Sequence, residues 1–174
     1  MSYPTSLRVQ FAHGLESSAQ GNKARYLARH YEACTPAMDT SDFASCVAIH
    51  ATTAANFQPD LLIGSSFGGA VAVALLARDL WRGPTLLLAP AALLYDPSAR
   101  LPASARVTLV HARADAIVPF QHSRILAAMG DPRRVELIPC DDDHALSTML
   151  AAGHLPGLIA RALVSQVPTS PFDY

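Results

Sequence analysis

Short apolar runs alternate with longer amphipathic stretches along most of the chain. Each run is rich in leucine, valine or isoleucine and is flanked by polar or turn-forming residues, as is typical of buried strands. The predicted strands are Leu7–Ala12, Asp60–Gly64, Thr85–Ala89, Arg106–His111 and Arg133–Pro139, with a weaker candidate near Tyr31–Thr35.

The stretches between these runs have the length and composition of helices. Proline cannot extend a helix, and the prolines at positions 59, 84 and 132 separate helices from strands. The predicted helices are Asn22–Tyr31, Asp42–Phe57, Phe67–Leu80, Phe120–Met129 and Ala145–Val164. This alternation predicts an α/β fold with a doubly wound, mostly or fully parallel sheet of about six strands and helices on both faces.

We expect a single domain over residues 1–174, because this length is close to that of one ordinary domain. The connection from Pro90 to Ala105 holds three prolines and has room for about one helical turn, so no cap domain is expected. The segment 168–174 contains two prolines and is predicted to be a loosely held tail.

Composition and charge narrow the class of protein. Hydrophobic residues make up 51% of the chain and charged residues 16%, so a packed core rather than disorder is expected. The formal net charge is −1 and no basic cluster is present, which argues against a nucleic-acid partner. The longest apolar stretch, Phe67–Ala77, is far shorter than the roughly 18 residues that span a bilayer, so no membrane partner is expected.

The cellular location follows from two features. Residues 1–8 lack the basic segment and apolar core of a secretory signal. Cys34, Cys46 and Cys140 are odd in number and widely spaced, which favours reduced thiols over a disulfide framework or a zinc site. We therefore expect a cytoplasmic protein. The sequence does not indicate its oligomeric state.

The segment from Leu61 to Ala70 places a G-x-S-x-G motif between a buried strand and a helix of small residues. A nucleophilic serine needs such a sharp strand-to-helix turn, and Gly64 and Gly68 leave room for it around Ser66. A phosphate-binding turn is the alternative. It is disfavoured because Ala70 stands where a Walker-type loop needs lysine.

Candidates for a base and an acid follow Ser66 at later strand ends. Asp115 lies in the loop after the Arg106–His111 strand, and His144 follows the last strand. The order serine, aspartate, histidine is the order of catalytic residues on this kind of fold. Asp96 and Asp143 are alternative acids, and the acidic run 141–143 has an equally good interpretation as the cap of the last helix.

The first strand ends in His13-Gly14-Leu15. Gly14 would let the backbone turn so that the N–H of Leu15 faces the nucleophile, and with the N–H of Phe67 it would form a two-donor oxyanion hole. His13 would brace this loop, and we assign His13 and Gly14 to the substrate-binding region. The walls of the pocket are expected to come from Leu15, Phe67, the Leu93–Leu101 connection and Ile117–Phe120, which are mainly apolar and so favour an uncharged acyl group.

In these four segments the sequence resembles the α/β-hydrolase superfamily, over almost the whole length from Leu7 to about Val164. It is most similar to the compact YqiA-like esterases, which share an H-G-x-x-S-S opening and an acidic run before the histidine. The resemblance implies a serine esterase or thioesterase with a small-molecule ester or thioester as substrate and with no metal or cofactor.

The sequence therefore predicts acyl transfer by a triad of Ser66, Asp115 and His144. A second hypothesis is a hydrolase-fold binding protein that holds a ligand or a protein partner without turnover. The nature of the acyl donor is left open by the sequence.

Overall fold

The computed structural model describes residues 6–164, so the predicted loose tail 168–174 lies outside the described residues. Six strands form one fully parallel sheet in the order β2-β1-β3-β4-β5-β6. The strands are β1 (Arg8–Ala12), β2 (Glu32–Cys34), β3 (Leu61–Ser65), β4 (Thr85–Leu88), β5 (Val107–Ala112) and β6 (Val135–Cys140).

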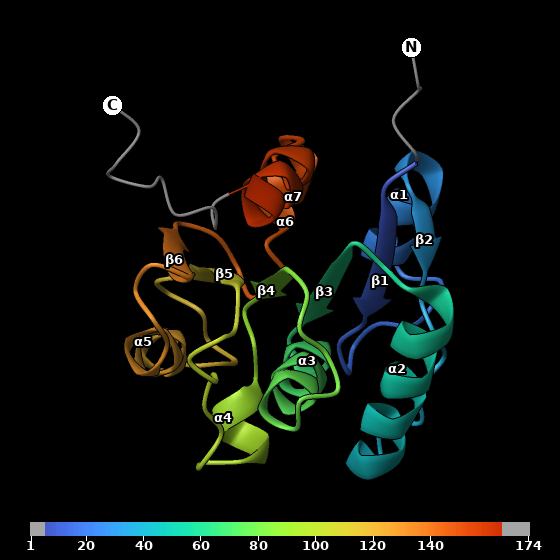
Figure 1. Cartoon of the computed structure of the whole chain (residues 1–174). Coiled ribbons are helices and arrows are strands. Elements are labelled where there is room, and N and C mark those ends of the chain that lie inside the picture. Colours follow the sequence, from blue (N-terminus) through green and yellow to red (C-terminus); the bar gives the residue numbers. More distant parts are fainter. Residues whose placement is uncertain (1–5, 165–174) are drawn as a thin grey trace, which may run out of the picture.

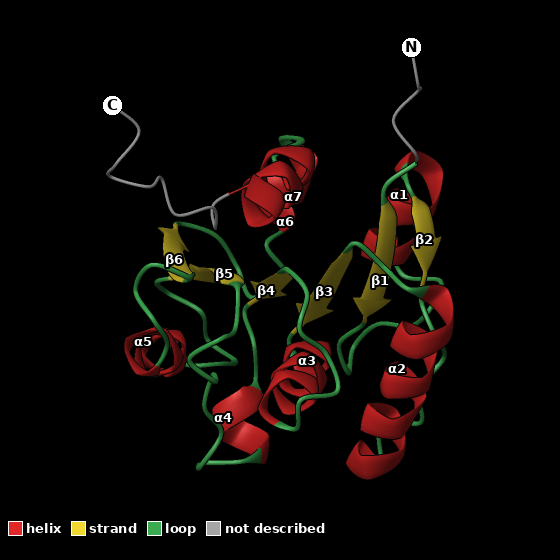
Figure 2. Cartoon of the chain, in the orientation of Figure 1, coloured by secondary structure: helices red, strands yellow, loops and turns green. Residues whose placement is uncertain are grey.

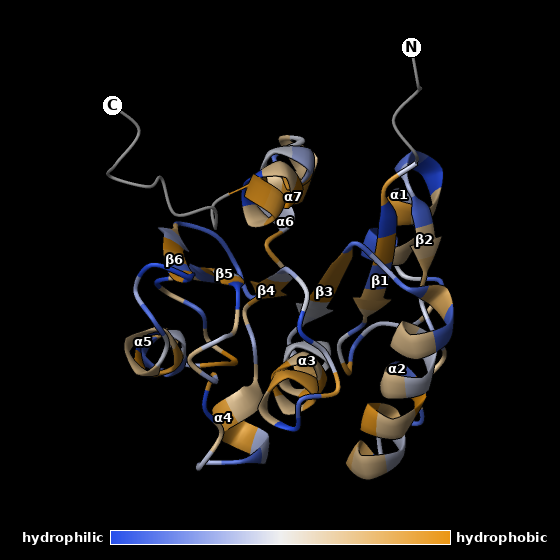
Figure 3. Cartoon of the chain, viewed as in Figure 1, coloured by the Kyte–Doolittle hydropathy of each residue, from blue (hydrophilic) through white to orange (hydrophobic). Residues whose placement is uncertain are grey.

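Helices cover both faces of the sheet (Figures 1 and 2). One face carries α1 (Asn22–His30), α6 (Ser147–Ala151) and α7 (Leu155–Val164), and the other carries α2 (Phe43–Phe57), α3 (Phe67–Ala77), α4 (Ala92–Tyr95) and α5 (Phe120–Met129). Each face has its own hydrophobic core, and Figure 3 shows the apolar character of α3 and α7. The predicted doubly wound α/β architecture is confirmed.

The predicted elements agree with the structure except in the last helix. The single helix expected over Ala145–Val164 is two helices, α6 and α7, with a break between them. Gly153 adopts a φ of +73° at this break, a left-handed conformation that ends a helix and that glycine accepts readily. The apolar pattern continues through the break, because both helices pack on the same face of the sheet.

The chain reverses its direction across the sheet at β1, which lies between β2 and β3. In open α/β sheets, ligands bind beyond the carboxyl ends of the strands at such a switch point. The register aligns these ends, pairing Ala12 with Gly64 and Ala112 with Cys140. The loops after β1, β3, β5 and β6 therefore emerge along the same edge.

The turn from β3 into α3 packs so closely against β1 that its glycine positions have no space for a side chain. A Cβ on Gly68 would lie 1.9 Å from the carbonyl oxygen of Ala12, and one on Gly64 would lie 2.5 Å from the carbonyl oxygen of Gly68. A Cβ on Gly69 would meet Pro90, after β4, at 2.7 Å, so this third glycine lets α3 approach the β4–α4 connection rather than the sheet. The start of α3 thus sits directly beside the end of β1.

We expect Gly68→Ala to destabilise the protein by about 1–3 kcal/mol or more, because backbone must move to admit the methyl group. Gly157→Ala is the matched control, since a Cβ there meets nothing within 4 Å and alanine favours a helix. Urea denaturation measures both variants. Equal free energies of unfolding for the two variants would contradict the tight packing described here.

A buried polar pair lies at the β1–α2 contact. The side-chain amide of Gln10 donates to His50 Nδ1 at 2.9 Å and to the His50 carbonyl oxygen at 3.0 Å. Burial, with a smaller contribution from nearby His13, lowers the pKa of His50 from 6.5 to about 4. Folded His50 therefore stays neutral at pH values where an unfolded histidine binds a proton.

Because the unfolded state binds more protons below pH 6.5, His50 should make the protein less stable as pH falls from about 6.5 to about 4, by roughly 3 kcal/mol at most. His50→Asn keeps an acceptor near Nδ1 but does not titrate. Its stability should depend less on pH in this window, as thermal unfolding at several pH values would show. An identical pH dependence in the two proteins would exclude His50 as the cause.

Candidate active site

Ser66 is the residue with a strained backbone in the β3–α3 turn. Its φ is +54° and its ψ is −114°, a conformation that non-glycine residues rarely adopt. Two backbone hydrogen bonds hold the residue there: its N–H donates to Leu88 O at 2.9 Å, and its carbonyl accepts from Ala91 N at 2.9 Å. The strain is thus fixed by β4 and by the connection that follows it.

The structure brings the three predicted triad residues into one hydrogen-bonded chain. His144 Nε2 lies 2.9 Å from Ser66 Oγ, and His144 Nδ1 lies 2.7 Å from Asp115 Oδ2. An ionised carboxylate only accepts hydrogen bonds, so Nδ1 carries a proton, and in the neutral imidazole the lone pair of Nε2 faces the serine. The His144 side chain is 22% exposed, whereas that of Asp115 is fully buried.

The Asp115 carboxylate accepts hydrogen bonds on both oxygens. Oδ1 accepts the backbone N–H groups of Ile117 at 2.8 Å and Val118 at 2.9 Å. Burial alone would raise the pKa of Asp115, but the hydrogen bonds from His144, Val118 and Ile117 outweigh burial and lower that pKa below its usual value. Asp115 is therefore an anion at neutral pH.

The two alternative acids are engaged elsewhere. Asp96 accepts from the backbone N–H and the hydroxyl of Ser98, at 2.9 Å and 2.6 Å, in a local turn. Asp143 accepts the N–H of Ser147 at 2.9 Å at the start of α6. Hydrogen bonds from Ser98 and Ser147 lower the pKa values of Asp96 and Asp143 respectively. Neither carboxylate hydrogen-bonds to His144, so the geometry favours Asp115 as the acid.

Several contacts fix the loop that carries His144. Asp142 accepts the N–H groups of Thr148 at 3.1 Å and Met149 at 2.8 Å, so the helix-capping interpretation of the acidic run holds for Asp142 and Asp143. Lys23 Nζ, from α1, donates to Ala145 O at 2.9 Å. Burial lowers the pKa of Lys23, and the nearby Asp143 and Asp142 partly oppose this shift.

The loop after β5 is also tied to the loop after β6. Arg113 N donates to Cys140 O at 2.9 Å, and the Arg113 guanidinium donates to Asp141 Oδ1 at 2.9 Å. Both side chains of this ion pair are more than half exposed, so the charge interaction adds little stability. The backbone hydrogen bond extends the β5–β6 pairing toward Asp115 and His144.

The loop after β1 approaches the serine. A Cβ on Gly14 would lie 3.4 Å from Ser66 Cβ and 4.0 Å from Ser66 Oγ, so the glycine leaves space in front of the hydroxyl. The His13 ring is buried, and its Nδ1 donates to Gly14 O at 2.9 Å. This contact supports the loop-bracing role of His13 rather than direct contact with a substrate.

The same carbonyl also accepts the Ser17 N–H at 3.3 Å. In a trans peptide the N–H points opposite to the carbonyl, so holding Gly14 O sets the direction of the Leu15 N–H. Within residues 6–164, neither the Leu15 N–H nor the Phe67 N–H has a backbone or side-chain acceptor. The two predicted oxyanion donors thus have no protein acceptor in this part of the chain.

Among the predicted pocket walls, Leu15 and Ile117 are exposed and Phe67 is not. The exposed fractions of the residues Leu15 and Ile117 are 50% and 65%; Leu15 lies in the proposed oxyanion loop and Ile117 lies two residues after the acid. Phe67 is fully buried against Phe43 and Tyr95, so the prediction that its side chain lines the pocket is wrong. Any contribution of Phe67 to the site is therefore through its backbone.

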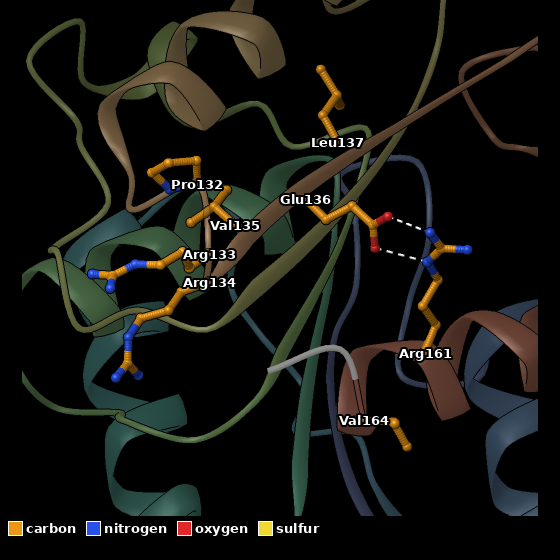
Figure 4. Close-up of a pocket in the computed structure, with 8 residues that line it drawn as sticks. All are labelled: Pro132, Arg133, Arg134, Val135, Glu136, Leu137, Arg161 and Val164. Atoms are coloured by element: carbon orange, nitrogen blue, oxygen red, sulfur yellow. Dashed lines mark hydrogen bonds and ion pairs between the residues drawn. The ribbon is translucent and has the colours of Figure 1, made fainter. Parts of the chain in front are cut away.

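Two cavities lie away from this site. One, of about 650 Å³, is lined by residues 132–137 at the amino end of β6 and by α7, where Arg161 pairs with Glu136 (Figure 4). The other, of about 300 Å³, lies at the end of α3 around Trp81. Both are at the opposite edge of the sheet from Ser66, so neither is the candidate site.

Sequence reasoning missed one residue of the site. His111, the second-last residue of β5, is fully buried, and its Nε2 lies 3.1 Å from Asp115 Oδ2. A histidine within a buried strand, four residues before the acid, is the signal that could have found it.

Cys34, Cys46 and Cys140 are free thiols. Among the side chains that the structure describes, no three His, Cys, Asp or Glu residues are grouped so as to hold a metal ion. No helix within residues 6–164 is long and apolar enough to cross a membrane.

No protein-family model and no curated protein matches the sequence. Solved structures do match. A protein from Xanthomonas campestris assigned to the α/β-hydrolase superfamily is 21% identical, with a TM-score of 0.71 over 91% of this chain and 96% of the other. For the esterase domain of a Rhodothermus marinus protein the identity is 19%, the TM-score 0.66 and the coverages 91% and 86%.

Mouse α/β hydrolase domain-containing protein 10 is 16% identical, with a TM-score of 0.66 over 88% of this chain and 90% of the mouse chain. The fold of this chain, one parallel sheet with helices on both faces, is thus shared with these proteins. The chain has the α/β-hydrolase fold.

Proposed function

We propose that this protein is a serine hydrolase that cleaves a carboxylic ester or thioester through an acyl-enzyme on Ser66. The observation that carries the proposal is the hydrogen-bonded chain from Ser66 Oγ through His144 to Asp115. The hydrolases and esterases among the matched structures add support at the level of the fold.

In the proposed reaction, His144 Nε2 takes the proton of Ser66 as Oγ attacks the acyl carbonyl carbon. The carbonyl π electrons move onto oxygen, and the N–H groups of Leu15 and Phe67 bind the oxyanion. Collapse of the tetrahedral intermediate breaks the bond to the leaving alkoxide or thiolate, which receives the proton from His144. The start of α3 adds the positive end of a helix dipole.

Water then completes the cycle. His144 takes a proton from a water molecule, whose oxygen attacks the acyl carbon of the ester on Ser66. The second tetrahedral intermediate collapses, the proton passes from His144 to Ser66 Oγ, and the carboxylic acid leaves. Throughout, Asp115 keeps the proton of the neutral imidazole on Nδ1 and stabilises the imidazolium when it forms.

The surroundings of the serine favour an uncharged acyl group. The side chains nearest in sequence to the proposed oxyanion donor and acid, Leu15 and Ile117, are apolar and about half or more exposed. Between β4 and β5 the chain forms only the four-residue α4, so the site is open to solvent on that side. Short or medium acyl chains are therefore the expected substrates.

We expect Ser66→Ala to lower kcat/KM by roughly 10⁴-fold while leaving the thermal midpoint little changed, because the hydroxyl serves the reaction rather than packing. Aryl esters and matched aryl thioesters of graded chain length measure the activity. Ser65→Ala, which changes the variable position of the motif, is the control and should have a much smaller effect.

A fluorophosphonate probe separates this proposal from a binding protein that does not turn over its ligand. The probe should label the wild-type protein on Ser66 and should not label Ser66→Ala. Absence of labelling in a folded wild-type protein, or more than a tenth of the activity in Ser66→Ala, would reject the acyl-enzyme.

The acid is tested by three matched substitutions. Asp115→Asn should lower kcat/KM by about 10⁴-fold, because the amide can donate to Nδ1 and so stabilises the wrong imidazole tautomer. Asp96→Asn and Asp143→Asn remove carboxylates that do not hydrogen-bond to His144, and these variants should retain most of the activity. A larger loss in Asp96→Asn or Asp143→Asn than in Asp115→Asn would mean that the acid is misassigned.

A further inference from the structure

We propose that His111 is a positioning residue of this site, which holds the Asp115 carboxylate in the orientation that His144 requires. The inference rests on the proposed function, because positioning matters only if His144 acts as a base. It assigns a role to a buried imidazole that the triad mechanism does not use.

The hydrogen bonds of His111 determine its tautomer. Nε2 lies 3.1 Å from Asp115 Oδ2 and 3.0 Å from the carbonyl oxygen of Val118, and both of these oxygens only accept. Nε2 therefore carries a proton and donates to both. Nδ1 lies 2.7 Å from Ser123 Oγ, whose hydroxyl can donate to it.

His111 stays neutral in this arrangement. Burial lowers the pKa of His111, against the opposing effects of the Val118 carbonyl and the Asp115 carboxylate, and His144 adds to the lowering. From α5 the ring contacts two uncharged groups, the Ser123 hydroxyl and the edge-to-face ring of Phe120 at 5.7 Å. The donor at Nε2 is therefore present whether His144 is neutral or protonated.

This donor completes the set of hydrogen bonds on the carboxylate. Oδ1 is held by two backbone N–H groups, and Oδ2 lies between the rings of His144 and His111. A carboxylate offers about four lone-pair sites, so the four N–H groups saturate it. Without His111, Oδ2 would be held by His144 alone, the group that changes its charge during the reaction.

A purely structural role makes a different prediction. His111 also joins the Val118 carbonyl to Ser123 of α5, and loss of these contacts alone would lower stability without changing the reaction in the folded molecules. The two roles are separated by measuring the reaction per active site and by comparing variants that keep or remove the donor at Nε2.

The variants are His111→Phe, which removes the donor at similar size, and His111→Gln, whose amide nitrogen can take the place of Nε2. Ser123→Ala is the matched control, because it removes the hydrogen bond at Nδ1 and leaves the donor to Asp115. Active sites are counted by fluorophosphonate titration, and kcat and KM are measured separately.

We expect His111→Phe to lower kcat by about 10- to 100-fold with little change in KM, the range seen when partners that orient metal-binding histidines are removed. His111→Gln should recover most of this loss, and Ser123→Ala should lower the thermal midpoint while keeping kcat. Equal kcat per active site in His111→Phe and wild type would overturn the proposal, as would an equal loss in Ser123→Ala.

Nitrogen-15 NMR of the wild-type protein gives a test that needs neither a variant nor turnover. His111 should show a protonated Nε2 and an unprotonated Nδ1, and the reverse tautomer would overturn the proposal even if His111→Phe fails to fold. The downfield resonance of the His144 Nδ1 proton should change in His111→Phe and be restored in His111→Gln. Failure of the proposed function would appear separately, as a wild-type protein without labelling at Ser66.

Discussion

A carboxylate with no exposed side-chain surface is stable as an anion only when hydrogen-bond donors replace the water it has lost, and Asp115 is such a group. Its four donors come from its own loop, from the end of β5 and from the loop after β6. The β5–β6 register, which pairs Ala112 with Cys140, brings these segments to the same point. His144 is one of these four donors, so its position is coupled to the stabilisation of the buried Asp115 charge.

The serine side of the site is held in a different way. Gly64 and Gly68 have no side chains, so the turn after β3 packs closely against β1. This close packing fixes Ser66 relative to the oxyanion loop. The base and acid are held mainly by directed hydrogen bonds, whereas the nucleophile is held mainly by steric fit and a strained backbone. The hydrogen bond from His144 Nε2 to Ser66 Oγ joins two regions whose positions are set independently.

What could be predicted from the sequence was local or depended on strand ends. The turn around Ser66 could be predicted because Gly64, Ser66 and Gly68 lie within five residues of the chain. Asp115 and His144 could be predicted because each follows an apolar run. The break at Gly153 was missed because both helices bury the same kind of residue on the same face.

The role of the Gln10–His50 pair was missed for a further reason. A polar residue inside an apolar strand does not show which partner satisfies it, and that partner can be 40 residues away, as it is for Gln10. Such partners are set by the stacking of helices on the sheet, which a linear pattern of residues does not contain.

In the proposed mechanism the loops that flank the serine act through their backbone. Leu15 would contribute an N–H to the oxyanion hole, and Ile117 donates its N–H to Asp115. Both residues are at least half exposed to solvent. A substitution at either side chain can therefore change the apolar surface offered to an acyl group and still leave these N–H groups in place. In the proposed mechanism these two side chains are therefore positions at which such a site could select its substrate. The acyl preference can then change through side chains while the reacting groups stay fixed by the sheet.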